Sequence, residues 1–185
     1  MPGGNWNIST MGTLSTGPYY TPVQWHKHEG HPGWTIDMID NILNTSLKTS
    51  PTPPDLITIH LGTNDCNANA SLDVMKTRMI SLLDHIHAAV PLAQVFLADV
   101  VGTGNAWNDC IVAFNAALPA IVAASAAKGQ KIWFTPMYNE TRICGGSGSD
   151  LGLCGGHQIH PTAAGYPRMA SAFARTILQH FKAPQ

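Results

Sequence analysis

In DLITIHLGTNDCN, residues 55–67, a nearly continuous apolar run passes directly into a glycine and a polar cluster, and this pattern indicates the fold class. Two further runs have the same character, QVFLADV at 94–100 and KIWFTP at 131–136. Short runs of this kind, rich in β-branched and aromatic residues, are typical of strands buried on both faces, as in a parallel sheet. We therefore expect three parallel strands here, and a weaker strand in NISTMGT at 7–13.

Helical patterns lie between the expected strands. Apolar residues recur at helical spacing over 35–47, and Ser71 is a candidate N-cap for a helix that reaches about Ala89. Asn108 or Asp109 could cap an alanine-rich helix ending near Gly129, and Thr162 opens the last helix. The alternating order predicts one domain over 1–185, a three-layer α/β/α sandwich with a parallel, flavodoxin-like sheet.

Composition limits the partners. A chain of 185 residues makes about one domain, and a net charge of -1 with 11% charged residues leaves no electrostatic footprint for nucleic acid. No apolar run approaches the roughly 20 residues of a membrane span, so no membrane partner is expected. The opening MPGGNWNIST is neither basic nor apolar enough for a signal peptide.

The cysteines indicate an oxidising compartment. The four of them form no CxxC pair, and glycines in CGGSGSDLGLC could let Cys144 meet Cys154. Cys66 and Cys110 both fall in loops expected at the active edge, which makes them the second predicted disulfide. Sequons for N-glycosylation and low charge add to this, so we expect a secreted, extracellular glycoprotein. The sequons stand at Asn7, Asn44, Asn69 and Asn139.

Ligands of such folds bind at the carboxyl ends of the strands, so the segments that follow the strands are where chemistry is expected. Asn64 presents a neutral amide that could stabilise an oxyanion, and Asp65 a carboxylate that could fix the loop or the neighbouring backbone. The alternative is a simple Asx turn that caps the strand. Gly33, just ahead of a helix, offers a backbone N–H as a second donor, and Trp34 could be only a helix-entry contact.

His160 is the expected general base. It follows a glycine-rich loop and precedes Pro161 and a helix, so its backbone is held while its ring faces the loop side. A metal site is not predicted, since the histidines of HKHEGH at 26–31 have no second ligand pair at matching spacing. A metal-dependent hydrolase built on His26, His28, His157 and His160 remains a third reading, and no other cofactor is expected.

Three blocks of the chain resemble the SGNH hydrolases, the GDSL-type esterases. They are GHPGWTID at 30–37, HLGTNDCN at 60–67 and IHPTAAGYPRMA at 159–170. The resemblance implies a flavodoxin-like sandwich and ester hydrolysis through an acyl-enzyme. It also implies Gly33 and Asn64 as oxyanion donors and His160 as base. Within the family, the chain is most similar to secreted members that act on acylated carbohydrates.

Two departures from the resemblance bear on the mechanism. The family's GDS serine and first strand are absent, so the domain reads as N-terminally truncated. His157 stands where the triad acid is usually Asp, and an imidazole cannot replace that carboxylate. A backbone carbonyl, or a carboxylate from elsewhere such as Asp65 or Asp150, could hold His160 instead. The nucleophile is then another hydroxyl such as Ser9 or Ser15, a water activated by His160, or a residue of a partner.

The predicted function is hydrolysis of short-chain or carbohydrate O-acyl esters, with an impaired or altered mechanism. Trp34, Trp107 and Asn67 are the expected substrate-binding residues, and a small ester or an acylated saccharide is the expected partner. The rival prediction is a non-catalytic carbohydrate-binding relative that keeps the cleft. A homodimer could cover the sheet edge that the absent strand exposes.

Overall fold

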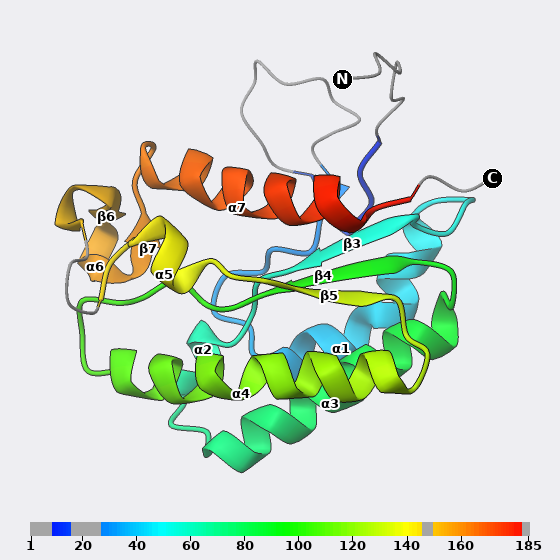
Figure 1. Cartoon of the computed structure of the whole chain (residues 1–185), viewed down its shortest axis with the longest axis horizontal. Helices are drawn as coiled ribbons and strands as arrows, with labels where there is room; N and C mark the ends of the chain where they lie inside the picture. The colour runs from blue at the N-terminus through cyan, green and yellow to red at the C-terminus, as the bar shows by residue number, and fades with distance from the viewer. Residues whose placement is uncertain (1–8, 16–26, 146–149, 183–185) are drawn as a thin grey trace.

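A parallel sheet of three strands forms the centre of the computed structural model, which describes residues 9–15, 27–145 and 150–182 (Figure 1). The strands are β3 (Leu56–Ile59), β4 (Gln94–Ala98) and β5 (Ile132–Thr135), in the order β3-β4-β5. In the register, Val95 of β4 lies opposite Ile57 of β3 and Ile132 of β5. All three strands predicted from the apolar runs are confirmed.

Burial across the sheet follows from its order. All five residues of the middle strand β4 are buried, because strands flank it on both sides and helices cover both of its faces. In the outer strand β3, Leu56 and Ile57 are half-buried and Thr58 is exposed. The core therefore centres on β4 and on the helix faces packed against it.

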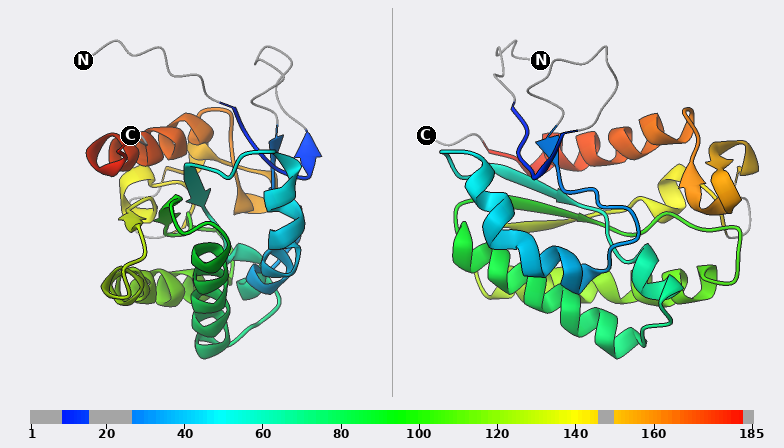
Figure 2. Two further views of the ribbon diagram at one scale, coloured as in Figure 1. Left: turned by 90° about the vertical axis from the view of Figure 1, so that its right-hand side faces the viewer. Right: turned by 180° about the vertical axis from the view of Figure 1, so that it is seen from behind.

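Helices cover the two faces of the sheet, so the predicted three-layer α/β/α sandwich is confirmed (Figures 1 and 2). On one face, α7 (Gly165–His180) contacts β4 and β5. On the other, α4 (Asn108–Ala127) contacts β5 and α3 (Leu72–Ala89), and α1 (Ile36–Ser46) packs against α3.

Helix starts agree with the sequence in one case and differ in two. The Ser71 hydroxyl accepts a hydrogen bond from the Val74 N–H, so the predicted N-cap of α3 is confirmed. The predicted caps of α4 are wrong, because Trp107 occupies the N-cap position while the Asn108 side chain accepts the Thr103 N–H at 3.1 Å. The last helix begins at Gly165 rather than Thr162, whose carbonyl oxygen instead closes a turn.

Short elements connect the main ones. The strand expected at 7–13 is wrong over its described part: residues 9–13 lie outside any strand, and residues 7 and 8 lie outside the described ranges. Instead β1 (Leu14–Ser15) pairs antiparallel with β2 (Lys27–His28), apart from the main sheet. The other short elements are η2 (Leu47–Thr49), α2 (Thr63–Asn67), α5 (Tyr138–Thr141), η3 (Leu151–Leu153), β6 (Cys154–Gly155), α6 (Gly156–Ile159) and β7 (His160–Pro161).

Both predicted disulfides form. Cys66–Cys110 joins α2 to α4, with 5.7 Å between the two Cα atoms. Cys144–Cys154 closes the loop that precedes β7, with 5.2 Å between its Cα atoms. The cross-links thus tie down two of the segments that follow the sheet strands.

Helix α4 is strongly apolar, although its sequence contains no uninterrupted apolar run of the length of a membrane span. Over 18 of its residues the mean hydropathy is 1.9, so length and composition alone would let it cross a membrane. Its buried residues, among them Ile111, Phe114 and Leu118, belong to the main hydrophobic core. Length and composition alone do not assign α4 to a membrane, because the core helix of a soluble protein passes the same test.

Candidate active site

The predicted site residues come from segments at one end of the sheet. The strands run in parallel, and α2, α5 and β7 all lie beyond their carboxyl ends (Figure 1). This is the edge at which doubly wound sheets bind their ligands. The structure therefore brings the asparagine and histidine blocks to the same side of the molecule.

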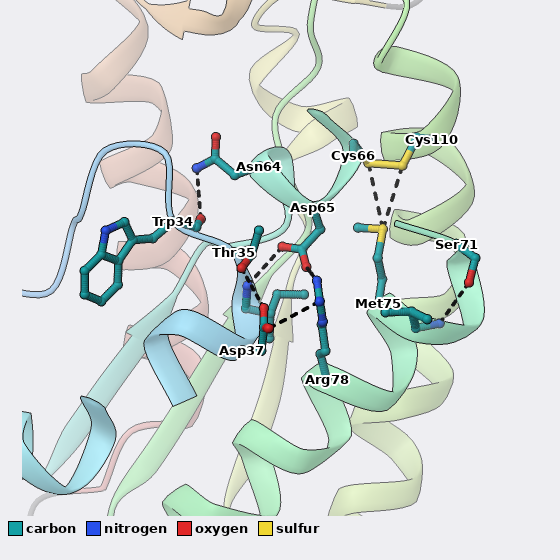
Figure 3. A network of polar contacts seen from close by, with 12 residues as sticks. Trp34, Thr35, Asp37, Asn64, Asp65, Cys66, Ser71, Met75, Arg78 and Cys110 are labelled. Atoms are coloured by element: carbon teal, nitrogen blue, oxygen red, sulfur yellow. Dashed lines mark hydrogen bonds and ion pairs between the residues drawn. A yellow bond between two sulfur atoms is a disulfide. The ribbon is translucent and has the colours of Figure 1, made fainter. Parts of the chain in front are cut away.

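Asn64 leaves the end of β3 through a turn that requires glycine. Gly62 has a φ of +131°, and a Cβ atom there would lie 2.7 Å from the Phe114 ring. Two residues on, the Asn64 side-chain amide donates a hydrogen bond to the Trp34 carbonyl oxygen at 2.9 Å (Figure 3). An amide nitrogen carries two hydrogens, and none of the described residues accepts the second one of Asn64.

Gly33 stands beside that contact. Its φ is +80°, its surface is exposed, and a Cβ atom built on it would meet nothing within 4 Å. None of the described residues accepts a hydrogen bond from its N–H. The backbone donor predicted at Gly33 is thus adjacent in sequence to the carbonyl that Asn64 binds.

Asp65 is fully buried and serves the backbone of α1. One carboxylate oxygen accepts the Ile36 N–H at 3.0 Å, and the other contacts Arg78 Nη1 at 2.7 Å (Figure 3). Burial raises the pKa of Asp65, while Arg78 and the Ile36 N–H act in the opposite direction. Fixing neighbouring backbone is one of the two roles predicted for this residue, and its direct part in catalysis stays a prediction.

Arg78 makes a second ion pair with Asp37, at 3.2 Å. The Thr35 hydroxyl donates to Asp37 at 2.6 Å, and this hydrogen bond is the main cause that lowers the pKa of Asp37. Thr35 holds the N-cap position of α1 but makes no side-chain cap. The capping acceptor comes instead from Asp65, 29 positions away.

His160 lies in β7, opposite Gly155 of β6, and its side chain is exposed. Within the described ranges no hydrogen-bond acceptor or donor contacts its ring. His157 belongs to α6, and its side chain lies outside the described residues. Asp150 accepts the Gly152 N–H at 3.0 Å and faces Arg168 at 3.7 Å.

The loop after β4 links the asparagine and histidine blocks. His60, at the end of β3, accepts the Val101 N–H on Nε2 at 3.1 Å, as expected of a hydrogen-bonded core histidine. Burial lowers the pKa of His60 to about 4, so its ring is neutral and its Nε2 lone pair is free to accept. Farther along, the Gly104 N–H donates to the Gln158 carbonyl oxygen at 2.8 Å, two residues before His160.

The predicted substrate-binding residues occupy different settings. The Trp34 ring is half-buried and stacks on His31, with 3.9 Å between the ring centroids. Trp107 is half-buried and packs against the main hydrophobic core, and Asn67 is exposed at the end of α2. Asn67 therefore ends the asparagine segment, the Trp34 backbone is bound by that segment, and Trp107 also has a packing role.

No group of three His, Cys, Asp or Glu side chains within the described part of the chain could hold a metal ion. Two of the four histidines in the metal reading, His26 and the side chain of His157, lie outside that part. His28 uses Nδ1 to accept the Gly30 N–H at 2.9 Å.

Sequence reasoning missed two residues that shape the site. Arg78 sits on a helix like any surface arginine, and only the fold brings it to Asp65. Asn115 donates to and accepts from the Val100 backbone at 2.8 Å and so fixes the loop after β4. Its signal was readable, because a single asparagine interrupts the apolar run IVAFNAALPAIV at 111–122.

Comparison with known proteins identifies the family. A model of the GDSL-like lipase/acylhydrolase family matches residues 13–168, which is most of the chain. The chain belongs to this family of ester hydrolases.

Solved structures similar to this GDSL-like chain include carbohydrate esterases. A family 3 carbohydrate esterase of Clostridium thermocellum has 27% sequence identity and a TM-score of 0.74, with 91% of this chain and 76% of that chain covered. One of Talaromyces cellulolyticus has 22% identity and a TM-score of 0.75, with 93% and 80% covered. At that lower identity the likeness concerns the fold alone.

Curated relatives of the GDSL-like chain are longer. A protein named multidomain esterase, from Ruminococcus flavefaciens, is 27% identical over 173 residues, which are 84% of this chain and 21% of that protein. A second relative, from Acetivibrio thermocellus, is 26% identical over 149 residues. The chain spans 60% of the length of that relative.

Proposed function

We propose that this chain hydrolyses short-chain or carbohydrate O-acyl esters. The family and the carbohydrate esterases among its structural relatives support this substrate class. The hydrogen bond from Asn64 to the Trp34 carbonyl oxygen carries the proposal, because it joins the two segments that hold the oxyanion donors.

In this mechanism a developing oxyanion accepts hydrogen bonds from the second Asn64 amide hydrogen and from the Gly33 N–H. Both groups are attached to backbone that is already held, so they need little reorganisation during the reaction. The exposed His160 ring takes the proton of the nucleophile and returns it to the departing alkoxide. Asn67 and the indole of Trp34 line the approach of the acylated group.

Water is the nucleophile that the described residues favour. Ser9 and Ser15 are both exposed, and within the described ranges neither hydroxyl is hydrogen-bonded to His160. His160 would deprotonate a water molecule as its oxygen attacks the ester carbonyl carbon. The tetrahedral intermediate then expels the alkoxide, which takes the proton from the imidazolium, so acid and alcohol leave.

Hydrolysis of p-nitrophenyl acetate tests the proposal in wild type, His160→Ala and Asn64→Ala, with and without a chelator. We expect turnover in wild type, loss of at least tenfold in His160→Ala, and no effect of the chelator. His85→Ala is the matched control, because His85 is an exposed histidine bound to Asp40 on the α1–α3 surface. Equal rates in wild type and His160→Ala would rule out the base.

A carbohydrate-binding relative without catalysis is the second candidate. The observation that favours it is the His160 ring, for which the described part of the chain supplies no orienting carboxylate. Isothermal titration with acetylated xylan discriminates the two functions. Binding by an inert wild type, unchanged in His160→Ala, would select the binding function.

We also propose that a second copy of the chain binds at the edge of the sheet to form a homodimer. Strand β3 pairs with β4 on one side, and no other strand of the described part pairs with it. Its free backbone groups could accept a second copy. Sedimentation velocity at several concentrations would detect the dimer, and a single monomer species throughout would contradict it.

Secretion and glycosylation complete the proposal. Both disulfides suit an oxidising compartment. The sequon asparagines Asn44, Asn69 and Asn139 are exposed, while Asn7 lies outside the described residues. Expression through a eukaryotic secretory pathway should give a product whose mass falls on endoglycosidase treatment, and an unchanged mass would exclude glycosylation.

A further inference from the structure

The N-terminus of α1 receives its cap from another part of the chain. Thr35, the residue at the cap position, directs its hydroxyl to Asp37, and the first free N–H of the helix, that of Ile36, is bound by Asp65. Asp65 directly follows Asn64, whose amide binds the Trp34 carbonyl oxygen. Two consecutive side chains of α2 thus fasten the segment that carries Gly33 (Figure 3).

Arg78 is the cation that offsets the cost of burying the Asp65 carboxylate. A fully buried carboxylate is costly unless a charge and hydrogen bonds compensate it. Asp65 has one backbone N–H from Ile36 and one guanidinium, at 2.7 Å, as its partners. The Arg78 side chain is 28% exposed, so it reaches Asp65 from the rim of the core. Its Nη1 contacts Asp65 and its Nη2 contacts Asp37.

Without Arg78 the Asp65 carboxylate would keep a single N–H partner in a buried setting. The chain could relieve that cost by moving α2 away from α1, and Asn64 would move with it. Within the described ranges Arg78 makes ion pairs with Asp65 and Asp37 and no hydrogen bond to Asn64 or Gly33. Any effect that it has on the oxyanion donors therefore passes through Asp65 or through Asp37, and a variant of Asp37 separates the two routes.

We propose that Arg78 is a positioning residue for ester hydrolysis, which holds the Asn64 segment against the Gly33 segment through Asp65. The inference rests on the proposed function. It predicts an effect on the rate of the chemical step rather than on substrate affinity, because donors to an oxyanion matter most in the transition state.

The kinetic test compares Arg78→Met, Asp37→Asn and the double variant Asp65→Asn/Arg78→Met on p-nitrophenyl acetate. In Arg78→Met we expect kcat to fall at least tenfold while KM changes less than twofold. The double variant should recover a substantial part of kcat, because an amide can still accept the Ile36 N–H and no unpaired charge remains. Asp37→Asn, which removes only the outer ion pair, should stay within threefold of wild type.

Lys76→Met is the matched surface control. Lys76 lies on the same helix and pairs with the exposed Asp73 at 3.0 Å, so its loss should leave kcat unchanged. If Arg78→Met retains the kcat of wild type, or if the double variant is no better than Arg78→Met, the inference is overturned while the proposed function stands.

Amide hydrogen exchange separates the inference from the proposed function. In Arg78→Met the segments 33–36 and 62–67 should exchange faster than in wild type, with β4 unchanged as the internal reference. A wild-type chain without hydrolysis would refute the proposed function and the kinetic half of the inference. The exchange rates would still test whether Arg78 holds the two segments together. Equal rates in wild type and Arg78→Met would overturn that part of the inference.

Discussion

The Asn64 side chain binds the carbonyl oxygen of Trp34 across 30 positions of sequence. This contact uses one amide hydrogen, and within the described ranges neither the other one nor the N–H of the neighbouring Gly33 has an acceptor. An asparagine side chain without such a contact would have to be oriented anew in each catalytic cycle. Here the structure has already ordered it, which is the condition for effective oxyanion stabilisation.

Replacing Asn64 by alanine should therefore damage catalysis far more than stability. Loss of one oxyanion donor lowers kcat by about 10²–10³ in hydrolases, and we expect a similar loss here. Steady-state kinetics with p-nitrophenyl acetate measure the effect. Asn67→Ala, at the exposed end of the same short helix, is the control for local structure and should act mainly on KM. A kcat near that of wild type in Asn64→Ala would contradict the role.

The disulfide between Cys66 and Cys110 should contribute more stability than the one between Cys144 and Cys154. The first closes a loop with a separation of 44 residues and the second one of 10. Loop-closure entropy then predicts losses of about 4 and about 3 kcal/mol for the two double alanine variants. Urea unfolding of each variant gives the comparison, and a reversed order would show that loop entropy does not dominate.

The free energy of unfolding should fall between pH 6.5 and about 4 because of His60. Its folded-state pKa, about 4, lies below the ordinary value of 6.5, so the unfolded chain binds more protons in this window. The full shift corresponds to about 3 kcal/mol, and the lost stability is smaller than this because His60 is only half-buried. Urea titrations across the window measure it.

His60→Gln is the control for that pH dependence. A glutamine oxygen can accept the Val101 N–H but does not titrate, so the variant should lack the His60 component of the pH dependence. If wild type and variant lose stability in parallel as the pH falls, His60 is not its source.

Variants of Asp99 separate the effect on stability of burying its charge from the effect of its hydrogen bonds. Its carboxylate accepts the N–H groups of Met137 and Tyr138 at the start of α5, and burial raises its pKa. A raised pKa means that the contribution of Asp99 to stability is greatest at low pH and declines as the group ionises with rising pH. Asp99→Asn keeps an acceptor without the charge, so at pH 7 it should be at least as stable as wild type.

Asp99→Ala should instead lose about 2–3 kcal/mol, because two N–H groups would be left without their acceptor. Thermal or urea unfolding at pH 5 and pH 7 compares both variants with wild type. The prediction fails if Asp99→Asn is as destabilised as Asp99→Ala.

The parallel strands, the three layers, both disulfides and the end of the sheet that carries the candidate site could all be predicted from the sequence alone. These follow from local pattern: apolar runs of strand length, helical spacing between them, and the side of the sheet to which parallel strands deliver their ends. Asn64 could be singled out because its block follows an expected strand, and His160 because it precedes an expected helix.

Which buried polar side chains pair with one another could be seen in the folded chain alone. The capping of α1 by Asp65, the pairing of Asp65 with Arg78, and the fixing of Val100 by Asn115 all join residues from different elements. Such pairs depend on how helices cross and on which carboxylate becomes buried. No local period or propensity records those choices, because desolvation acts on a group only once the surrounding chain has closed over it.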